Sequence, residues 1–135
     1  MNLTIDTFAW IEILRDTTRG RAAARRIESA ERSLTPSVVL AEFASACRRD
    51  GLSDDTILGE LAAIQEASDI VPIDTSIALG AAHVLTELRD FSRKRKIGLP
   101  GLVDSVVLAT ARRERTSLLT GDPHFEAIPE TVWIG

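Results

Sequence analysis

Residues 3 to 14 read LTIDTFAWIEIL, and this stretch passes from a short apolar strand directly into a helix. The run Leu3 to Ile5 favours a buried strand, and the apolar residues from Phe8 to Leu14 recur at helical spacing. Asp6 stands between the two elements, where a helix cap is expected. The stretch therefore predicts a strand–helix unit with a carboxylate at the junction.

The same alternation of short strands and longer helices continues along the chain. Further strands are expected at residues 34–35, 70–73, 117–119 and 131–134, and helices over 21–31, 36–49, 53–67, 75–96 and around residue 104, with a brief helical turn within 120–125. Parallel strands need crossover connections, which the helices would supply. The pattern predicts an α/β fold, a three-layer sandwich with a central, mostly parallel sheet, as a single domain over residues 1–135.

The composition restricts where the protein acts and what it binds. No apolar run approaches the ~20 residues of a membrane span, and the amino terminus lacks the basic start and long apolar stretch of a secretory signal. We therefore expect a cytoplasmic protein with no membrane partner. The single cysteine, Cys47, excludes an internal disulfide and any Cys-x-x-Cys zinc motif. The net charge of -4 argues against nucleic-acid binding through overall charge, so any such binding must be local.

Four acidic residues are expected to approach one edge of the sheet. Asp6 directly follows the first strand, and Asp122 comes soon after the strand at 117–119, so both belong at the carboxyl edge, where open parallel sheets bind ligands. Glu42 and Asp104 fall on the apolar sides of their helices, which turns them towards the interior.

Each acid has a purely structural alternative. Asp6 and Asp122 are good helix caps, the latter because Pro123 follows it. Glu42 and Asp104 would instead need salt-bridge partners, although few basic residues lie on those faces. If all four converge, two carboxylates 4 Å apart repel by about 4 kcal/mol at an effective dielectric constant of 20. A divalent cation relieves such repulsion, and an all-oxygen site favours Mg²⁺ or Mn²⁺, ions that suit phosphate chemistry.

Four segments, IDTFAWIE (5–12), SVVLAEFA (37–44), GLVDSVVLATA (101–111) and LLTGDPHF (118–125), carry these acids. In this order the chain resembles the PIN-domain family, and specifically the VapC-type toxins of prokaryotic toxin–antitoxin pairs, from Leu3 to Ile134. The resemblance implies a metal-dependent endoribonuclease that hydrolyses RNA phosphodiester bonds, is silenced by a cognate antitoxin and forms a homodimer.

The resemblance also implies roles for individual residues. Asp6, Glu42, Asp104 and Asp122 correspond to the catalytic and metal-binding acids of the family, with Asp6 and Asp104 the principal ligands. Thr7 and Thr120 match the hydroxyl positions beside the first and last acids and would orient ligands or water; local capping is the alternative.

The RNA would need cationic contacts for its phosphates. The densest source is a cluster at the end of the helix over 75–96: Arg89, Arg93, Lys94, Arg95 and Lys96. These residues would also favour the helix dipole without any RNA. A second cluster, Arg112, Arg113 and Arg115, lies roughly 12 Å along its helix from Asp104, too far for direct catalysis.

The aromatic residues and the two histidines are not expected to take part in RNA binding or catalysis. Aromatic residues make up 4% of the chain and none is tyrosine, so extensive base stacking is not expected. His124 is expected to be a solvated loop residue and His83 a surface or interface residue.

Three rival functions are open to a small α/β protein with acids at strand ends. A receiver-like phosphorylatable signalling domain needs a lysine after a late strand, whereas Lys94 and Lys96 occupy a basic helix tail. A haloacid-dehalogenase phosphatase needs Asp-x-Asp after the first strand, and Phe8 occupies the second of those positions. An inactive PIN-like binding module would fit the fold, but all four acids are present.

Overall fold

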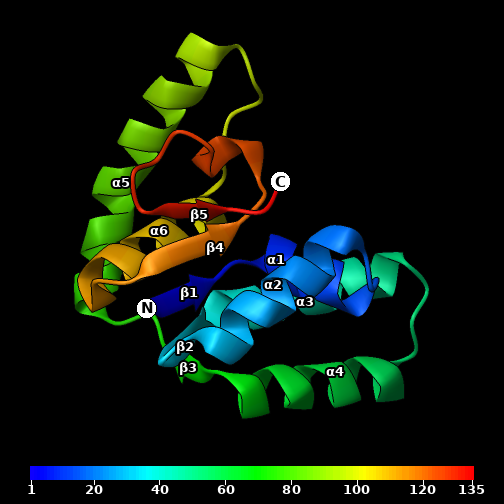
Figure 1. The fold of residues 1–135 in the computed structure, drawn as a ribbon. Helices are drawn as coiled ribbons and strands as arrows, with labels where there is room; N and C mark the ends of the chain where they lie inside the picture. The colour runs from blue at the N-terminus through cyan, green and yellow to red at the C-terminus, as the bar shows by residue number, and fades with distance from the viewer.

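A five-stranded sheet lies at the centre of the computed structural model, which describes residues 1–135. Its strands are β1 (Asn2–Ile5), β2 (Arg32–Pro36), β3 (Asp69–Val71), β4 (Ser117–Thr120) and β5 (Thr131–Trp133). They are ordered β3-β2-β1-β4-β5, and every neighbouring pair is parallel (Figure 1). The predicted mostly parallel sheet is confirmed, and it is parallel throughout.

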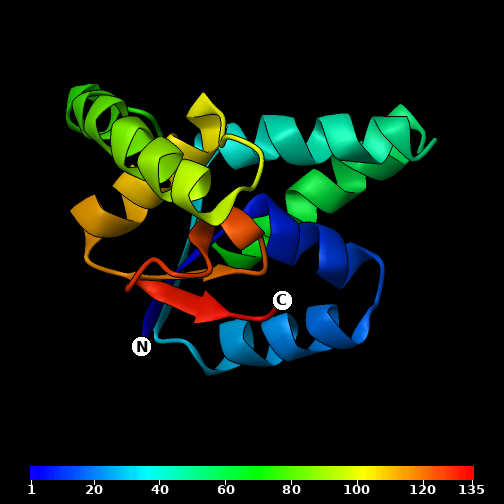
Figure 2. The ribbon, with the colours of Figure 1, turned by 90° about the horizontal axis from the view of Figure 1, so that it is seen from above.

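Helices cover both sides of this sheet. They are α1 (Thr7–Leu14), α2 (Thr18–Ser29), α3 (Ser37–Arg49), α4 (Asp54–Ala67), α5 (Thr75–Arg95) and α6 (Leu102–Glu114), followed by a 3-10 turn, η1 (Pro123–Phe125). α6 packs across β1, β2 and β4, and α5 packs against α6. α2 lies on the opposite side of the sheet (Figure 2). No helix combines the length and apolar character that a bilayer crossing requires. The expected three-layer α/β architecture is confirmed.

The apolar core is formed around β1, β4 and α6. Leu3 and Leu118 are at most 1% exposed, as expected for parallel strands covered on both faces. In α6, every residue from Ser105 to Ala111 is buried, which explains the continuous small and apolar stretch there. This packing fixes the carboxyl ends of β1 and β4 and the first turn of α6.

The predicted bounds of α2 were displaced by about one turn. The helix begins at Thr18 because the Thr17 hydroxyl accepts a 2.9 Å hydrogen bond from the Gly20 amide and thereby caps it. It ends at Ser29, where the backbone of Ala30 becomes extended. The alanine- and arginine-rich pattern correctly predicted a helix here, but it did not identify Thr17 as the cap.

Two prolines lie at strand ends where the structure differs from the prediction, and the remaining strand ends differ by at most two residues. β3 was expected over 70–73 but ends at Val71, because Pro72 has no N–H group to continue the ladder. Pro36 was expected to begin a helix, yet it is the last residue of β2 and pairs with Val71. α3 therefore begins one residue later, at Ser37.

Candidate active site

A cavity of about 350 Å³ lies beside the carboxyl ends of β1 and β4, and all four predicted acids line it. The acids come from the β1 end (Asp6), α3 (Glu42), the first turn of α6 (Asp104) and the segment after β4 (Asp122). The other lining residues are Thr7, Phe8, Ile11, Glu12, Arg15, Ala46 and Arg49. A larger cavity, of about 500 Å³, adjoins Leu3 and α2 but contains no carboxylate side chain. The convergence of acids therefore distinguishes the smaller cavity.

Asp6 is the most buried of the four acids, at 3% exposure. It caps α1, since its Oδ1 accepts a 2.8 Å hydrogen bond from the Thr7 amide. Its Oδ2 accepts a second bond of 2.8 Å from the Thr120 hydroxyl. Burial raises the pKa of Asp6 to about 7; the charges of Asp122 and Asp104 act in the same direction, and the Thr120 bond opposes them. Asp6 therefore both caps α1 and lines the acidic cavity, so its two predicted roles are compatible.

Asp104 lies in the first turn of α6, where backbone N–H groups are unpaired. Its Oδ2 accepts a 3.2 Å hydrogen bond from the Gly101 amide. Burial raises the pKa of Asp104 to about 6, followed by repulsion from Asp122, and Glu42 adds to the increase. The raised pKa values of both Asp6 and Asp104 follow from carboxylates held close together away from water.

Glu42 forms the α3 wall of the cavity and makes no hydrogen bond or ion pair. The salt-bridge alternative for Glu42 and Asp104 is wrong, because neither is paired with a lysine or an arginine. The only basic side chain with a nitrogen within 4.0 Å of an Asp104 oxygen is His124, whose Nδ1 lies at the limit of that distance. The cluster therefore retains an excess of negative charge.

Asp122 is held by the turn that follows it. Its Oδ1 accepts a 2.9 Å hydrogen bond from the His124 amide and so caps η1. Its own amide donates to the Thr120 hydroxyl oxygen at 3.0 Å. The preceding residue, Gly121, lies so close to the Phe8 ring that a Cβ atom there would collide with it. This close approach brings the end of β4 against α1 and places Asp122 beside Asp6.

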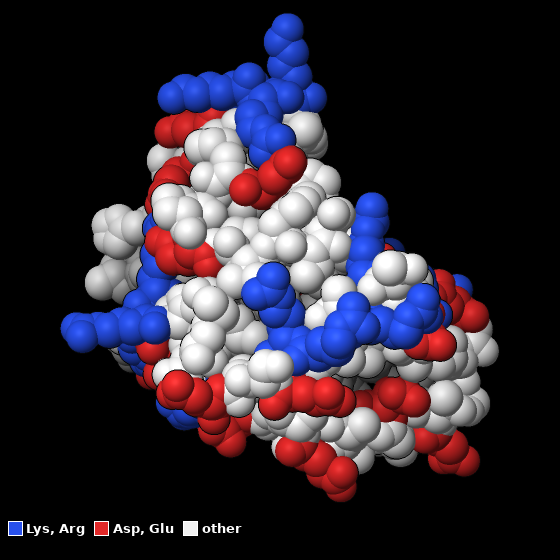
Figure 3. Space-filling view, in the orientation of Figure 1, with Lys and Arg blue, Asp and Glu red and all other residues white.

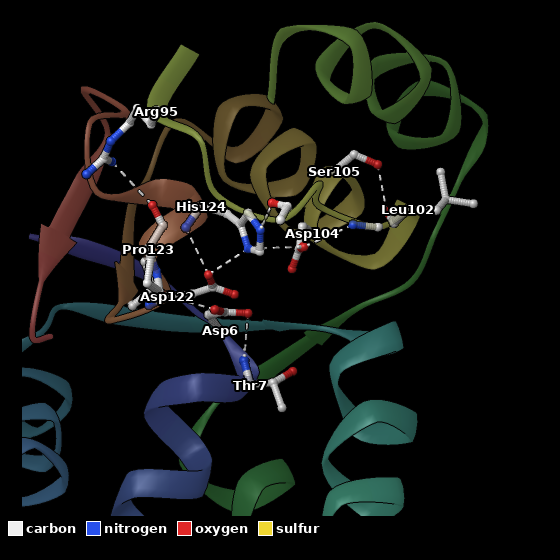
Figure 4. A network of polar contacts seen from close by, with 12 residues as sticks. Asp6, Thr7, Arg95, Leu102, Asp104, Ser105, Asp122, Pro123 and His124 are labelled. Atoms are coloured by element: carbon white, nitrogen blue, oxygen red, sulfur yellow. Dashed lines mark hydrogen bonds and ion pairs between the residues drawn. The ribbon is translucent and has the colours of Figure 1, made fainter. Parts of the chain in front are cut away.

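His124 is not the solvated loop residue that the sequence suggested, and that expectation was wrong. The side chain is 24% exposed, and both ring nitrogens are engaged (Figure 4). Nε2 lies 2.6 Å from the carbonyl oxygen of Gly98, which can only accept, so Nε2 carries a proton. Nδ1 lies 2.8 Å from Oδ1 of Asp122 and 4.0 Å from Oδ2 of Asp104. Asp104, Asp122 and His124 together present ligand atoms that all lie within 4.8 Å of one another.

The two threonines differ in how they contribute. Thr120 donates to Asp6 and accepts from the Asp122 amide, so it connects the first and last acids. Thr7 lines the cavity with a buried hydroxyl that has no hydrogen-bond partner. An unpaired buried hydroxyl is costly, which indicates a site that a ligand or water completes.

The predicted basic cluster forms the exposed tip of α5, seen at the top of Figure 3. Arg95 contacts the turn after Asp122, through Glu126 at 2.8 Å and the Pro123 carbonyl at 3.4 Å. Arg93 pairs with Asp90 at 3.3 Å. The three remaining members, Arg89, Lys94 and Lys96, make no ion pair, and Arg89 is half-buried. The structure thus places this cluster next to the segment that carries Asp122, while contact with RNA stays a prediction.

Two members of the second basic cluster have structural partners instead. Arg112 forms ion pairs with Glu87 at 2.7 Å and Glu130 at 3.0 Å, and Arg113 pairs with Asp74. These contacts tie α6 to α5 and to the segment before β5. Neither arginine lines the acidic cavity, and the expectation that the cluster takes no direct part in catalysis stays a prediction.

Comparison with protein families identifies the fold and the family. The family model described as the PIN domain matches residues 3–131. A search of curated proteins found no significant match by sequence.

Several solved structures share the fold. A toxin–antitoxin complex from Klebsiella pneumoniae superposes with a TM-score of 0.72 and 19% identity, covering 98% of each chain. VapC20 from Mycobacterium tuberculosis, described as a sarcin–ricin-loop-cleaving toxin, gives 0.71 and 18% identity over 94% of this chain and 95% of that one. VapBC2 from Rickettsia felis, bound to a promoter DNA fragment, gives 0.69 and 16% identity over 98% and 97%. Since the family model extends over nearly the whole sequence, this protein belongs to the PIN-domain family.

Proposed function

We propose that the protein is a divalent-metal-dependent endoribonuclease, acting in the cytoplasm as the toxin of a type II toxin–antitoxin pair. The observation that carries the proposal is the convergence of Asp6, Glu42, Asp104 and Asp122 on one cavity, with no ion pair between any of them and a lysine or arginine. Several close carboxylates destabilise a fold unless a cation accompanies them.

The residues around the cavity fit a hard divalent ion. Every candidate acidic ligand offers oxygen, and the one cysteine, Cys47, is buried in the core away from them. The raised pKa values of Asp6 and Asp104 mean that burial and mutual repulsion disfavour their ionised forms, a cost that a bound cation would relieve. Asp6 and Asp104 would be the principal ligands of Mg²⁺ or Mn²⁺, with Glu42 and Asp122 completing the set. When bound, the ion would activate water as the nucleophile and stabilise charge on the phosphate.

The chain itself holds the reacting groups in position. Asp6 is fixed by the Thr7 amide and the Thr120 hydroxyl, so its two oxygens have one orientation before any ligand arrives. Asp104 is fixed by the Gly101 amide at the start of α6. Groups held in advance need little reorganisation, which is how positioning lowers a reaction barrier.

The substrate and partner are inferred from the family and from the similar structures. VapC20 is described as cleaving the sarcin–ricin loop, an RNA element, and the Klebsiella protein is a toxin–antitoxin complex. We infer that this protein cleaves RNA, is bound by a cognate antitoxin and forms a homodimer. A receiver-like function is not favoured, since no lysine lines the acidic cavity.

The decisive experiment is an RNA cleavage assay with Mg²⁺ or Mn²⁺ and with EDTA, comparing the wild type with Asp104→Asn. The wild type is expected to cut only with the metal, and the variant to lose nearly all activity while circular dichroism shows that it is folded. Equal cleavage by the two proteins would refute the assignment. Sequencing the 5′ ends of the fragments would then define the RNA that is cut.

A further inference from the structure

Two arginines line the same cavity as the four acids, and neither was singled out by the sequence pattern. Arg15 follows the end of α1, and Arg49 is the last residue of α3. Arg15 donates to Asp50 at 2.7 Å and uses one of its terminal nitrogens to do so. Arg49 is exposed and makes no hydrogen bond or ion pair. An arginine that borders an acidic cavity without pairing with its acids is available to a ligand.

The position of Arg49 on α3 relates it to the acids. Glu42, Ala46 and Arg49 recur at intervals of four and three residues, and all three line the cavity. Arg49 follows Glu42 by seven residues, or roughly 10.5 Å along the helix at 1.5 Å per residue. The Arg49 backbone therefore lies about two helical turns beyond Glu42, a separation that suits a contact with an adjacent part of a long substrate.

Local charges hold the end of α3 near α1. The Arg15–Asp50 ion pair joins the residue after α1 to the residue after α3, which are 35 positions apart in the chain. Because Asp50 directly follows Arg49, this pair lies beside the backbone from which the Arg49 side chain extends. Arg15 itself lines the cavity, as Arg49 does.

We propose that Arg49, assisted by Arg15, binds a phosphate of the RNA strand next to the phosphate that is cleaved. The inference rests on the proposed function and extends it to how the substrate is held. A guanidinium group matches phosphate oxygens through paired hydrogen bonds, whereas four carboxylates alone would repel the strand. The tip of α5 is another basic region near the acids, where Arg95 contacts Pro123 and Glu126 in the turn after Asp122 (Figure 4). The strand would then extend across the acids, from the α5 side to the end of α3.

The neighbouring residue provides a matched control. Arg48 belongs to the same turn of α3 but pairs with Asp54 at 3.3 Å and does not line the cavity. Arg48→Gln and Arg49→Gln therefore remove the same charge from the same helix end. Arg49→Lys keeps the charge but loses the paired geometry.

The test measures binding of a fluorescent single-stranded RNA at several salt concentrations, with Ca²⁺ in place of Mg²⁺ and a denaturing gel to confirm that the RNA stays intact. Arg49→Gln is expected to weaken binding roughly 10-fold and to reduce the slope of log K against log salt by about 0.7, the value for one phosphate contact on a single strand. Arg49→Lys should keep the slope but lose part of the affinity, and Arg48→Gln should match the wild type.

Three outcomes would overturn the inference. Equal behaviour of Arg49→Gln and Arg48→Gln, with RNA cleavage by the wild type intact, would refute the Arg49 contact alone. If Arg49→Gln weakened only the complex with the antitoxin, the arginine would serve an acidic protein segment instead of RNA. A wild-type protein that neither binds nor cleaves RNA would refute the proposed function and the inference together.

Discussion

The hydroxyl of Thr120 donates a 2.8 Å hydrogen bond to Oδ2 of Asp6, joining residues 114 positions apart. The contact exists because β1 and β4 are neighbours in the sheet and both residues follow or end their strands at the same edge. Thr120 also accepts from the Asp122 amide. One buried hydroxyl therefore sets the positions of two acids that come from opposite ends of the chain.

We predict that Thr120→Val lowers both stability and RNA cleavage, although valine has nearly the same shape as threonine. The change removes the hydrogen bond that lowers the pKa of Asp6, so this pKa should rise further above 7. A buried acceptor left without its donor costs about 1 to 3 kcal/mol, so both stability and activity at neutral pH should fall. Urea unfolding and the pH profile of RNA cleavage would measure the two effects. Thr120→Ser retains the hydroxyl and should remain close to the wild type; an unchanged pH profile in Thr120→Val would contradict the role of this bond.

We expect the stability of the protein in EDTA to fall as the pH rises from 4 to 8. The pKa of Asp6 is about 7 in the folded protein against 3.8 as its ordinary value, so between these values the folded state binds more protons than the unfolded state. Stability conferred by the protonated form is therefore lost as the pH increases through 7. For Asp6 the difference amounts to on the order of 4 kcal/mol as an upper bound, and Asp104 acts in the same direction.

Urea unfolding at pH 5 and pH 8 in EDTA tests this dependence. Asp6→Asn should remove most of it, whereas Asp16→Asn, which changes an exposed acid outside the cavity, should leave it intact. Mg²⁺ or Mn²⁺ should reverse the trend, because metal binding favours the deprotonated carboxylates. Stability that increases between pH 5 and pH 8 without metal would show that these acids are not strained by burial.

The sequence predicted the convergence of the four acids better than it predicted the groups around them. Asp6, Glu42, Asp104 and Asp122 could be found because local patterns, a strand end or an inward helical position, mark each one. His124 was missed because its environment depends on Gly98, 26 positions away. The signal was only that it follows Asp122 by two residues within a proline turn, which directs its side chain back to the acid.

The two cavity arginines were missed for a similar reason. Their placement depends on the packing of the α1 end against the α3 end, recorded by the Arg15–Asp50 pair, and no local pattern specifies it. The densest run of basic residues in the sequence instead predicted phosphate contacts at the tip of α5. The predicted start of α2 was wrong for a related reason, because the Thr17 hydroxyl caps the helix three residues earlier than the sequence pattern indicated.

Asp104→Asn should stabilise the protein in EDTA while it abolishes cleavage. The substitution removes one charge from the repelling cluster and leaves an amide oxygen that can accept from Gly101. The expected gain at pH 8 is about 1 to 2 kcal/mol, after allowance for the partial exposure of the side chain. Thermal unfolding should show a higher midpoint for the variant in EDTA and a smaller increase on adding Mg²⁺ than the wild type shows. A lower midpoint in EDTA would mean that Asp104 supports the fold more than it opposes it.

His124 should act as a positioning residue for Asp122. Its ring spans from the Gly98 carbonyl to the Asp122 carboxylate, so it holds the loop between α5 and α6 against the turn after β4. His124→Ala would release both contacts, and loss of such a supporting partner typically costs roughly 10- to 100-fold in metal affinity or activity. Calorimetric titration with Mn²⁺ and the kcat of RNA cleavage would measure the loss.

The other histidine provides the control for this prediction. His83 is exposed on α5 and lies outside the acidic cavity, so His83→Ala should leave metal affinity and kcat unchanged. His124→Asn retains a short polar side chain near Asp122 but cannot reach Gly98 in the same way, and it should recover part of the activity. If His124→Ala bound Mn²⁺ and cleaved RNA as well as His83→Ala, the ring would have no part in holding Asp122, and the hydrogen bond from the His124 amide would suffice to position that acid.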